Sequence, residues 1–344
     1  MALKWLEGFE SYGVTNTNTV TGLAKKYTTS QTDSNFTIQA GRIAGHGVQF
    51  SASATIQPPV FTARSTWTVG FAYKQDVISS NSQILRFQDS TSIQIELELS
   101  KDGEFQVYRG ASEVTIIARS TGAKIRPGIW NYIEIKHFCD DSTGTVELRV
   151  NGIAVLTFTG DTKQTGNATD DRIVFLGSSN GSSKSYYDDI YICDNQGSNN
   201  TTFLGSQKVT MILPTGDHGT NQWTPNSGAN HYDRVNENPH DSSTTYLSDS
   251  TSGDTEEFDY ANTGSEISSI KGIQVNTVFE TDSASAFSVK NHINSGGASS
   301  DDAGTAGTNG TYTTAGFVAE TDPNTSALWT KTNLDAALFG VKTV

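Results

Sequence analysis

Hydrophobic and polar positions alternate most regularly between Trp130 and Thr159. Two runs in this stretch, 132–136 and 146–150, alternate between apolar and polar side chains. Alternation of this kind places one face of a strand on a core and the other face in water. Asn151-Gly152 separates the second run from a return strand at 155–158, and both residues tolerate the positive φ of a tight hairpin turn. The pattern predicts three consecutive antiparallel strands.

Shorter runs of the same kind occur through the first 200 residues, separated by turn-forming residues. A spacing of about 8 to 12 residues between strands is typical of a β-sandwich. In the run 93–99 we expect Gln94, Glu96 and Glu98 on the solvated face. A short helix is expected near 23–27. The other predicted strands are 5–9, 41–50, 67–74, 84–87, 105–108, 114–118, 173–176 and 188–193.

The pattern changes near residue 203. A strand is predicted at 208–214, and the following residues, to about 258, contain few aliphatic side chains and are expected to form long loops. Ser295 to Asn309 is rich in Gly, Ser and Ala and predicts a flexible loop. The other predicted elements are strands at 270–280, 286–293, 312–320 and 341–344 and a helix at 334–338 capped by Thr332 or Asn333. We therefore predict two domains, residues 1–213 and 214–344.

The phrase WNYIEIKHFCDDSTGTVELRVNG, residues 130–152, resembles the centre of laminin-G and concanavalin A-like jelly rolls. This resemblance implies a curved antiparallel sandwich whose first strand pairs near 189–192. The predicted fold class is all-β: an antiparallel concanavalin A-like jelly-roll sandwich followed by a smaller β-rich domain.

A second resemblance rests on phrases that lie between the end of the first domain and the C-terminus. The phrases YYDDIYICD, FLGSQKVTMILPTGD and TDPNTSALWTKTNLDAALFGVK resemble those of tailed-phage virion proteins in which a jelly roll precedes a compact β domain. The residues that carry it are Asp188, Asp189, Leu204, Gly205, Pro214, Gly216, Trp223, Asp322, Pro323, Trp329, Leu334, Phe339 and Gly340. The resemblance implies a structural component of a virion.

Composition and charge narrow the class of partner. The chain has 344 residues and a formal net charge of −14, and we find no cluster of Lys and Arg. Binding to nucleic acid or to an anionic membrane is therefore not expected. No segment predicts a secretory signal or a membrane span. We expect a protein made in the host cytoplasm, placed in the virion and released by lysis.

The two cysteines, Cys139 and Cys193, each follow an alternating run. Two buried free thiols are the expected arrangement, and a disulfide is the alternative if the two strands are neighbours.

Two motifs bear on catalysis. Glu96 and Glu98 could form a carboxylate pair like that of a glycosidase, but the glycosidase pattern E-x-D-x-x-E of this fold is incomplete here. Gly177 to Gly181 matches G-x-S-x-G, but a strand rather than a helix is expected after it. The sequence therefore predicts no catalytic residues and a protein that is not an enzyme.

Pairs of Asp residues in turns make a calcium ion the only cofactor that the sequence suggests. Oxygen ligands from loop Asp residues suit Ca²⁺, and Asp140 and Asp141 are the candidates. The alternative is that this pair only forms a turn, as Asp often does without a metal. Apart from this calcium ion, no cofactor is expected.

Exposed aromatic side chains beside Asn and Asp could stack on sugar rings. The candidates are Trp223, Tyr232, Tyr246, Tyr186 and Tyr187. The alternative is that these rings anchor loops to the core.

The preferred function is that of a non-enzymatic virion structural protein on the particle exterior, as a tail fibre, another tail appendage or a head decoration. It would act by docking on other virion proteins and by symmetric assembly, with a homotrimer as the expected oligomer. A glycan-binding adhesin module that contacts host surface polysaccharide is the alternative. A polysaccharide hydrolase or lyase is the third hypothesis.

Overall fold

The computed structural model describes residues 1–13, 19–29, 35–111, 114–178, 180–282 and 287–344. The chain divides into two compact units, Met1–Thr210 (unit 1) and Met211–Val344 (unit 2). The division lies just before the boundary predicted after Leu213. No helix among the described residues is long and apolar enough to cross a membrane.

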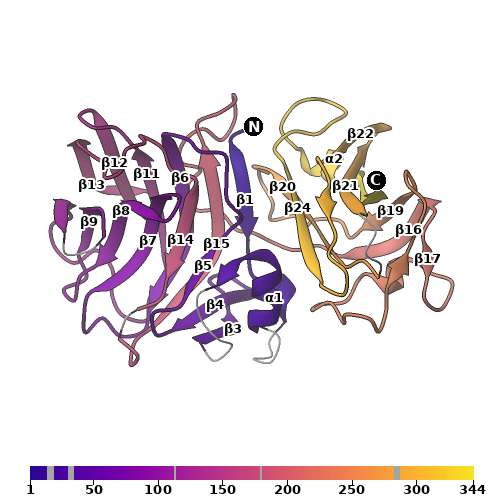
Figure 1. The fold of residues 1–344 in the computed structure, drawn as a ribbon, viewed down its shortest axis with the longest axis horizontal. Helices are drawn as coiled ribbons and strands as arrows, with labels where there is room; N and C mark the ends of the chain where they lie inside the picture. The colour runs from indigo at the N-terminus through magenta and orange to yellow at the C-terminus, as the bar shows by residue number, and fades with distance from the viewer. Residues whose placement is uncertain (14–18, 30–34, 112–113, 179, 283–286) are drawn as a thin grey trace. The chain divides into compact units, whose positions relative to one another are not determined.

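Unit 1 is built from two antiparallel sheets (Figure 1). The first sheet has the order β13 (Ile153–Gly160), β12 (Gly144–Val150), β11 (Asn131–Phe138), β6 (Thr66–Gln75), β15 (Lys184–Asp194), β4 (His46–Ser51), β3 (Phe36–Ala40), with β1 (Leu3–Glu7) also on β15. The second has the order β10 (Thr115–Arg119), β9 (Phe105–Arg109), β8 (Ser92–Leu99), β7 (Ser82–Asp89), β14 (Arg172–Leu176), β5 (Thr55–Gln57), β2 (Thr28–Thr29). The helix α1 (Thr19–Lys26) and the short 3-10 turn η1 (Glu10–Tyr12) complete the unit.

The core of unit 1 lies between the two sheets. Trp67 and Phe71 of β6 and Phe87 and Phe175 of the second sheet are fully buried in one cluster. Alternate residues of β11 and β12 join it, as the alternation in the sequence predicts. The all-β antiparallel fold class is confirmed. The predicted pairing of the first strand is confirmed too, because Glu7 lies opposite Ile190.

The hairpin between β12 and β13 has the predicted turn. Asn151 has φ 51° and Gly152 has φ 81°, both in the left-handed region. A β-carbon at Gly152 would meet no atom within 4 Å, so only backbone conformation selects glycine there.

We expect Gly152→Ala to destabilise unit 1 by about 1 kcal/mol, because alanine is strained at this φ. Urea unfolding measures the change. Gly166→Ala is the matched control, since a β-carbon there also meets nothing and its φ lies outside the left-handed range. An equal response of the two variants would contradict the prediction.

Residues 203–209, the crossing segment, run over the outer face of the first sheet. The backbone N–H of Gly205 donates to Glu134 Oε1 at 2.8 Å, and the N–H of Val209 donates to Asp189 Oδ1 at 2.8 Å. Arg42 donates to Ser206 Oγ at 2.6 Å and also to the Gln207 carbonyl. The strand predicted at 208–214 is wrong: residues 208–213 lie in no strand, and one begins only at Pro214. The N–H of Val209 is bonded to the Asp189 side chain rather than to a neighbouring strand.

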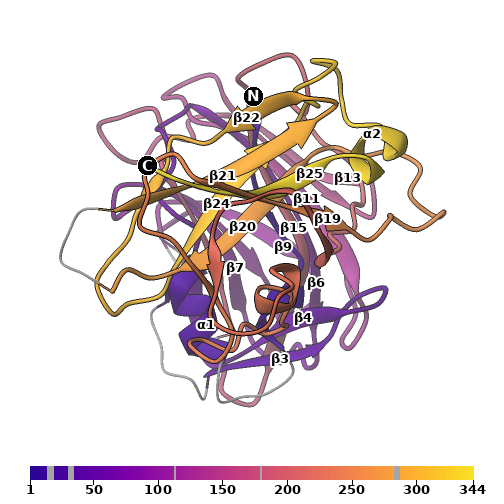
Figure 2. The same ribbon diagram turned by 90° about the vertical axis from the view of Figure 1, so that its right-hand side faces the viewer.

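Unit 2 has one larger antiparallel sheet and two two-stranded sheets (Figure 2). The larger sheet has the order β16 (Pro214–Asn221), β19 (Thr255–Tyr260), β25 (Leu338–Thr343), β21 (Ser288–Ser295), β22 (Ala298–Asp301), and β23 (Thr305–Ala306) also pairs with β21. The two-stranded sheets are β17 (Thr224–Pro225) with β18 (Leu247–Ser248), and β20 (Ile273–Phe279) with β24 (Thr313–Ala319). A 3-10 turn, η4 (Tyr232–Arg234), lies between β17 and β18, and a helix, α2 (Lys331–Asp335), lies between β24 and β25.

Three predictions for unit 2 are wrong. The segment after residue 214, expected to form long loops to about 258, contains most of β16, all of β17 and β18 and part of β19. The segment 295–309 is not one flexible loop, because β22 and β23 lie within it and pair with β21. The helix begins earlier than predicted and Thr330 caps it, accepting a hydrogen bond from the Asn333 N–H at 3.1 Å. Of the strand predicted at 286–293, residue 286 lies outside the described residues.

Candidate functional site

Two aromatic rings and one ammonium group meet on the outer face of the first sheet. We call Lys74, Trp130 and Tyr186 the aromatic–lysine cluster. Lys74 Nζ lies 4.0 Å from the centroid of the Tyr186 ring and 4.9 Å from that of the Trp130 ring. The two ring centroids are 6.3 Å apart, with an interplanar angle of 71°. All three side chains are partly exposed.

Strand register brings the cluster together. Tyr186 of β15 lies opposite Lys74 of β6, and Trp130 directly precedes β11, the neighbour of β6 on its other side. Partial burial lowers the pKa of Lys74 and raises that of Tyr186, and the charge of Asp76 raises both. The lysine remains a cation at neutral pH and attracts the faces of both rings.

Tyr187, the neighbour of Tyr186, does not belong to this surface. Its side chain has no exposed area, and its hydroxyl donates to the carbonyl oxygens of Ile84 at 3.1 Å and Leu176 at 2.5 Å. Successive residues of a strand point to opposite faces, so only one of the two tyrosines can face solvent. The prediction that Tyr187 contacts a glycan is wrong.

The cluster has the chemistry of a sugar-binding surface. Aromatic rings offer flat apolar faces for the C–H groups of a sugar, and the ammonium offers three donors to its oxygens. Ile129, which is 57% exposed, extends the apolar surface next to Trp130. The cation favours a sugar that carries a carboxylate.

Two other predicted residues, Trp223 and Tyr232, lie together in unit 2 on a network of carboxylates. Glu256 accepts hydrogen bonds from the Trp223 N–H at 2.9 Å and lies 2.8 Å from His231 Nδ1. Asp217 accepts from the N–H of Tyr232 at 2.6 Å and from that of His231 at 2.9 Å. Burial raises the pKa of Glu256. The network holds the backbone of both residues, and whether their rings bind a glycan or anchor loops stays a prediction.

Tyr246 directly precedes β18, whose partner β17 begins right after Trp223. Its backbone N–H donates to Asn226 Oδ1 at 3.3 Å, its carbonyl accepts from the Asn226 N–H at 3.0 Å, and its side chain is 43% exposed. Burial, together with the charges of Glu280, Asp241 and Tyr246, raises the pKa of Tyr312 to about 12. Glycan contact by the three predicted aromatic residues of unit 2 stays a prediction.

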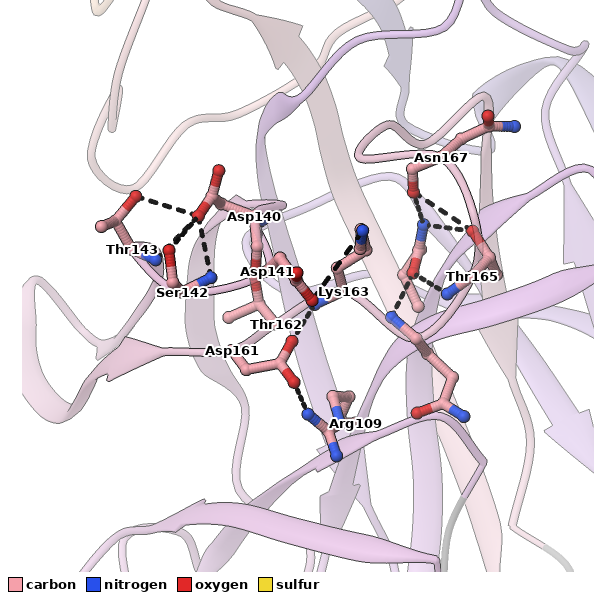
Figure 3. Close-up of polar contacts among 12 residues, drawn as sticks. Arg109, Asp140, Asp141, Ser142, Thr143, Asp161, Thr162, Lys163, Thr165 and Asn167 are labelled. Atoms are coloured by element: carbon pink, nitrogen blue, oxygen red, sulfur yellow. Dashed lines mark hydrogen bonds and ion pairs between the residues drawn. The ribbon is translucent and has the colours of Figure 1, made fainter.

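The calcium candidates lie in a turn after β11 (Figure 3). Asp140 Oδ1 accepts from the N–H groups of Ser142 and Thr143 at 2.9 and 2.7 Å and from their hydroxyls at 3.3 and 3.0 Å. These bonds lower the pKa of Asp140 to about 2. Asp141 lies 3.8 Å from Lys163 Nζ. Both carboxylates thus have local partners, as expected for a turn, and calcium binding stays a prediction.

The face of β8 that carries Glu96 and Glu98 is not solvated, contrary to expectation. Glu96 has no exposed area and pairs with Arg86, which also donates to Gln83 Oε1 at 3.0 Å. Glu98 Oε1 accepts from Asn81 Nδ2 at 2.9 Å and from the Tyr108 hydroxyl at 3.1 Å. Cross-strand neighbours on β7 and β9 therefore cover both carboxylates. Neither offers the open approach that a hydrolytic water and a sugar require.

A loop closes the start of the same strand (Figure 3). Gln94 Nε2 donates to Thr165 Oγ1 at 2.7 Å and to the Asn167 carbonyl at 2.6 Å. Because these contacts join residues about 70 apart in the chain, no local pattern indicates them. The central residue of the G-x-S-x-G match, Ser179, lies outside the described residues, and β15 follows it at Lys184.

The structure also decides between two free thiols and a disulfide. Cys139 and Cys193 are both buried and free. The strand β6 lies between β11 and β15, so the two thiols come from strands that are not neighbours.

Trp130 and Lys74 were not singled out from the sequence as binding residues. Trp130 is visible there only as the residue before a strand, and Lys74 only as the polar end of an alternating run. Tyr186 is the only member of the cluster that the sequence indicates as a binding residue. The other two side chains lie beside it only because of the cross-strand register.

Comparison with known proteins agrees with the fold of unit 1. The family described as the concanavalin A-like lectin/glucanases superfamily matches residues 46–199. No curated protein matches the chain. The fold of unit 1 is thus concanavalin A-like, a class that by its description includes lectins and glucanases.

Several solved structures are similar to this part of the chain. The cellulose-induced protein Cip1 is 12% identical over 59% of this chain and 100% of its own, with a TM-score of 0.42. The alginate lyase Aly36B, in complex with an alginate trisaccharide, is 12% identical over 54% and 96%, with a TM-score of 0.39. The binding domain of botulinum neurotoxin DC, in complex with SialylT, is 12% identical over 49% and 42%, with a TM-score of 0.36.

Proposed function

We propose that the chain is a non-catalytic glycan-binding module that uses the aromatic–lysine cluster to bind a carboxylated polysaccharide. The observation that carries the proposal is the partly exposed cation between two aromatic rings, with Nζ 4.0 and 4.9 Å from their centroids. The rings would pack on the sugar, and Lys74 would pair with its carboxylate. The concanavalin A-like fold supports a role in carbohydrate recognition.

Binding to purified polysaccharides tests this proposal. We expect the full chain to bind alginate or polygalacturonate more tightly than uncharged dextran in isothermal titration. Trp130→Ala should weaken binding at least tenfold, which corresponds to about 1.4 kcal/mol. Lys74→Gln should remove the preference for the charged polysaccharides, because it removes the cation and keeps much of the stem.

Ile153→Ala is the control, since it removes an exposed apolar side chain from β13 of the same sheet. It should leave binding unchanged. No binding of the acidic polysaccharides at millimolar repeat concentration, or equal binding of dextran, would overturn the proposal.

The place of action is proposed from the resemblance to tailed-phage virion proteins. The module would lie on the particle exterior, as a tail fibre, another tail appendage or a head decoration, docked on other virion proteins and assembled as a symmetric homotrimer. There it could contact host surface polysaccharide. Labelled antibodies against the chain should decorate intact virions in electron micrographs. Absence of the chain from purified particles would exclude this location.

A polysaccharide hydrolase or lyase is the second candidate, because Glu96 and Glu98 share one face of β8 and Arg86 of β7 lies opposite Glu96. The burial of Glu96 and its pairing with Arg86 speak against catalysis there. We expect no release of reducing or unsaturated sugars from any polysaccharide that binds. Release that is lost in Glu96→Gln would establish the enzyme instead.

A further inference from the structure

A histidine, a cysteine and an aspartate meet inside the sandwich of unit 1, away from the proposed glycan surface. His137 is on β11, Cys139 follows that strand, and Asp170 precedes β14. One potential ligand atom from each lies within 4.8 Å of the others, and all three residues are buried. We call them the buried His–Cys–Asp cluster.

Two buried polar atoms of this cluster have no partner. His137 Nε2 and Asp170 Oδ1 make no hydrogen bond to any described residue. The other pair, His137 Nδ1 and Asp170 Oδ2, lies 3.1 Å apart and forms an ion pair when the imidazole is protonated. Both side chains have no exposed area. Buried groups of this kind nearly always have a partner, so these atoms indicate a ligand.

We propose that the buried His–Cys–Asp cluster binds a divalent transition metal ion, with Zn²⁺ as the best match. Imidazole, thiolate and carboxylate are all zinc ligands, and this mixed set suits zinc better than calcium or magnesium. Tetrahedral coordination at zinc bond lengths places ligand atoms about 3.3 to 3.6 Å apart. His137 Nδ1 and Asp170 Oδ2, at 3.1 Å, are slightly closer than this, and the ligand atoms of the cluster lie within 4.8 Å of one another, so binding requires the side chains to adjust. Three protein ligands leave one position for a water molecule.

Charge also favours a metal at this position. One Zn²⁺ with a thiolate, a carboxylate and a neutral imidazole has no net charge, whereas a carboxylate alone in the core is costly. Without a metal, burial raises the pKa of Asp170, and burial together with the Asp170 charge raises that of Cys139 to about 12. A bound metal ion removes the proton from its thiol ligand, so these shifts describe the metal-free state only.

Burial speaks against a catalytic triad. A nucleophilic cysteine needs access for its substrate. Cys139 is only 1% exposed. The site is therefore structural, and the metal would join the end of β11 to the loop before β14.

The backbone around the cluster is held in place, as a metal site requires. The Asp170 N–H donates to the Arg64 carbonyl at 2.8 Å, and Trp67 Nε1 donates to the Asp170 carbonyl at 3.0 Å. The Cys139 N–H donates to the Ser65 carbonyl at 2.8 Å. The ligands are thus fixed by β6 and by the residues just before it.

Metal content tests the proposal. The full chain, produced with added Zn²⁺ and purified without chelator, should contain about one zinc per chain by elemental analysis. Cys139→Ser should reduce that content at least tenfold. Cys193→Ser is the matched control, because it removes the other buried thiol, and it should retain the zinc.

Cobalt binding gives a second measurement, which does not depend on whether Cys139→Ser folds. Chain produced with added Co²⁺ should show a thiolate-to-cobalt charge-transfer absorption, and Cys193→Ser should keep it. Absence of this absorption from the wild-type chain would overturn the proposal. So would less than about one-tenth of a zinc per chain, or equal zinc in Cys139→Ser and wild type.

Discussion

Replacing Tyr187 with alanine should destabilise unit 1 by about 3 to 5 kcal/mol, as is typical for large buried aromatic residues. The ring has no exposed area and lies 4.9 Å from Phe50 and 5.7 Å from Phe71 and Phe175, centroid to centroid. These neighbours come from both sheets, so the cavity would lie at their interface. Urea unfolding followed by circular dichroism measures the loss.

Two further variants show how much of the lost stability comes from the hydroxyl and how much comes from removing any tyrosine at this point of the strand. Tyr187→Phe keeps the ring but leaves the Ile84 and Leu176 carbonyls without this donor, so a loss of about 1 to 2 kcal/mol is expected. Tyr186→Ala, on the outer face, should change stability by less than about 1 kcal/mol. A loss in Tyr187→Ala no greater than in Tyr186→Ala would show that the strand faces are assigned wrongly.

The second large effect concerns Asp188, whose carboxyl is buried beside Asp189. Burial, then the charge of Asp189, raises its pKa to about 7 in the folded chain, against about 3.9 in an unfolded one. The folded state therefore binds an extra proton between these values. Its stability increases as the pH falls from 8 to 5, by about 2 kcal/mol from this group. The gain is complete once the pH lies below the unfolded value.

Asp188→Asn should remove this dependence. Asparagine resembles the protonated acid, because it is neutral and keeps one oxygen acceptor for the N–H of Arg42 or Asp189. At pH 8 the variant should be more stable than wild type by about 4 kcal/mol, and the difference should fall to about 1.5 kcal/mol at pH 5 and vanish only below the unfolded pKa. Urea unfolding across this pH range gives both values.

Asp141→Asn is the control, since it removes one charge from an exposed side chain. Its stability should follow the wild-type pH curve. Parallel curves for wild type and Asp188→Asn would show that Asp188 is ionised in the folded state throughout this range.

Local patterns in the sequence predict most strands of unit 1 and their antiparallel arrangement, but not β2, β3 and β5. The alternation in 132–136 and 146–150, with Asn151-Gly152 after the second run, required only local geometry, since the period of two and the positive φ are properties of a few adjacent residues. The same rule shows that Tyr186 and Tyr187 point to opposite faces. It does not show which face is the core.

Tertiary structure decided what the polar residues do. Gln94 and Glu96 alternate like solvated residues, yet a loop and Arg86 bury them. The aromatic–lysine cluster depends on the register of β15 on β6, and the buried His–Cys–Asp cluster depends on a loop that returns about 30 residues after β11. Such contacts join residues distant in the chain, and burial and charge pairing are set by those neighbours. A local pattern of polar and apolar residues does not contain them.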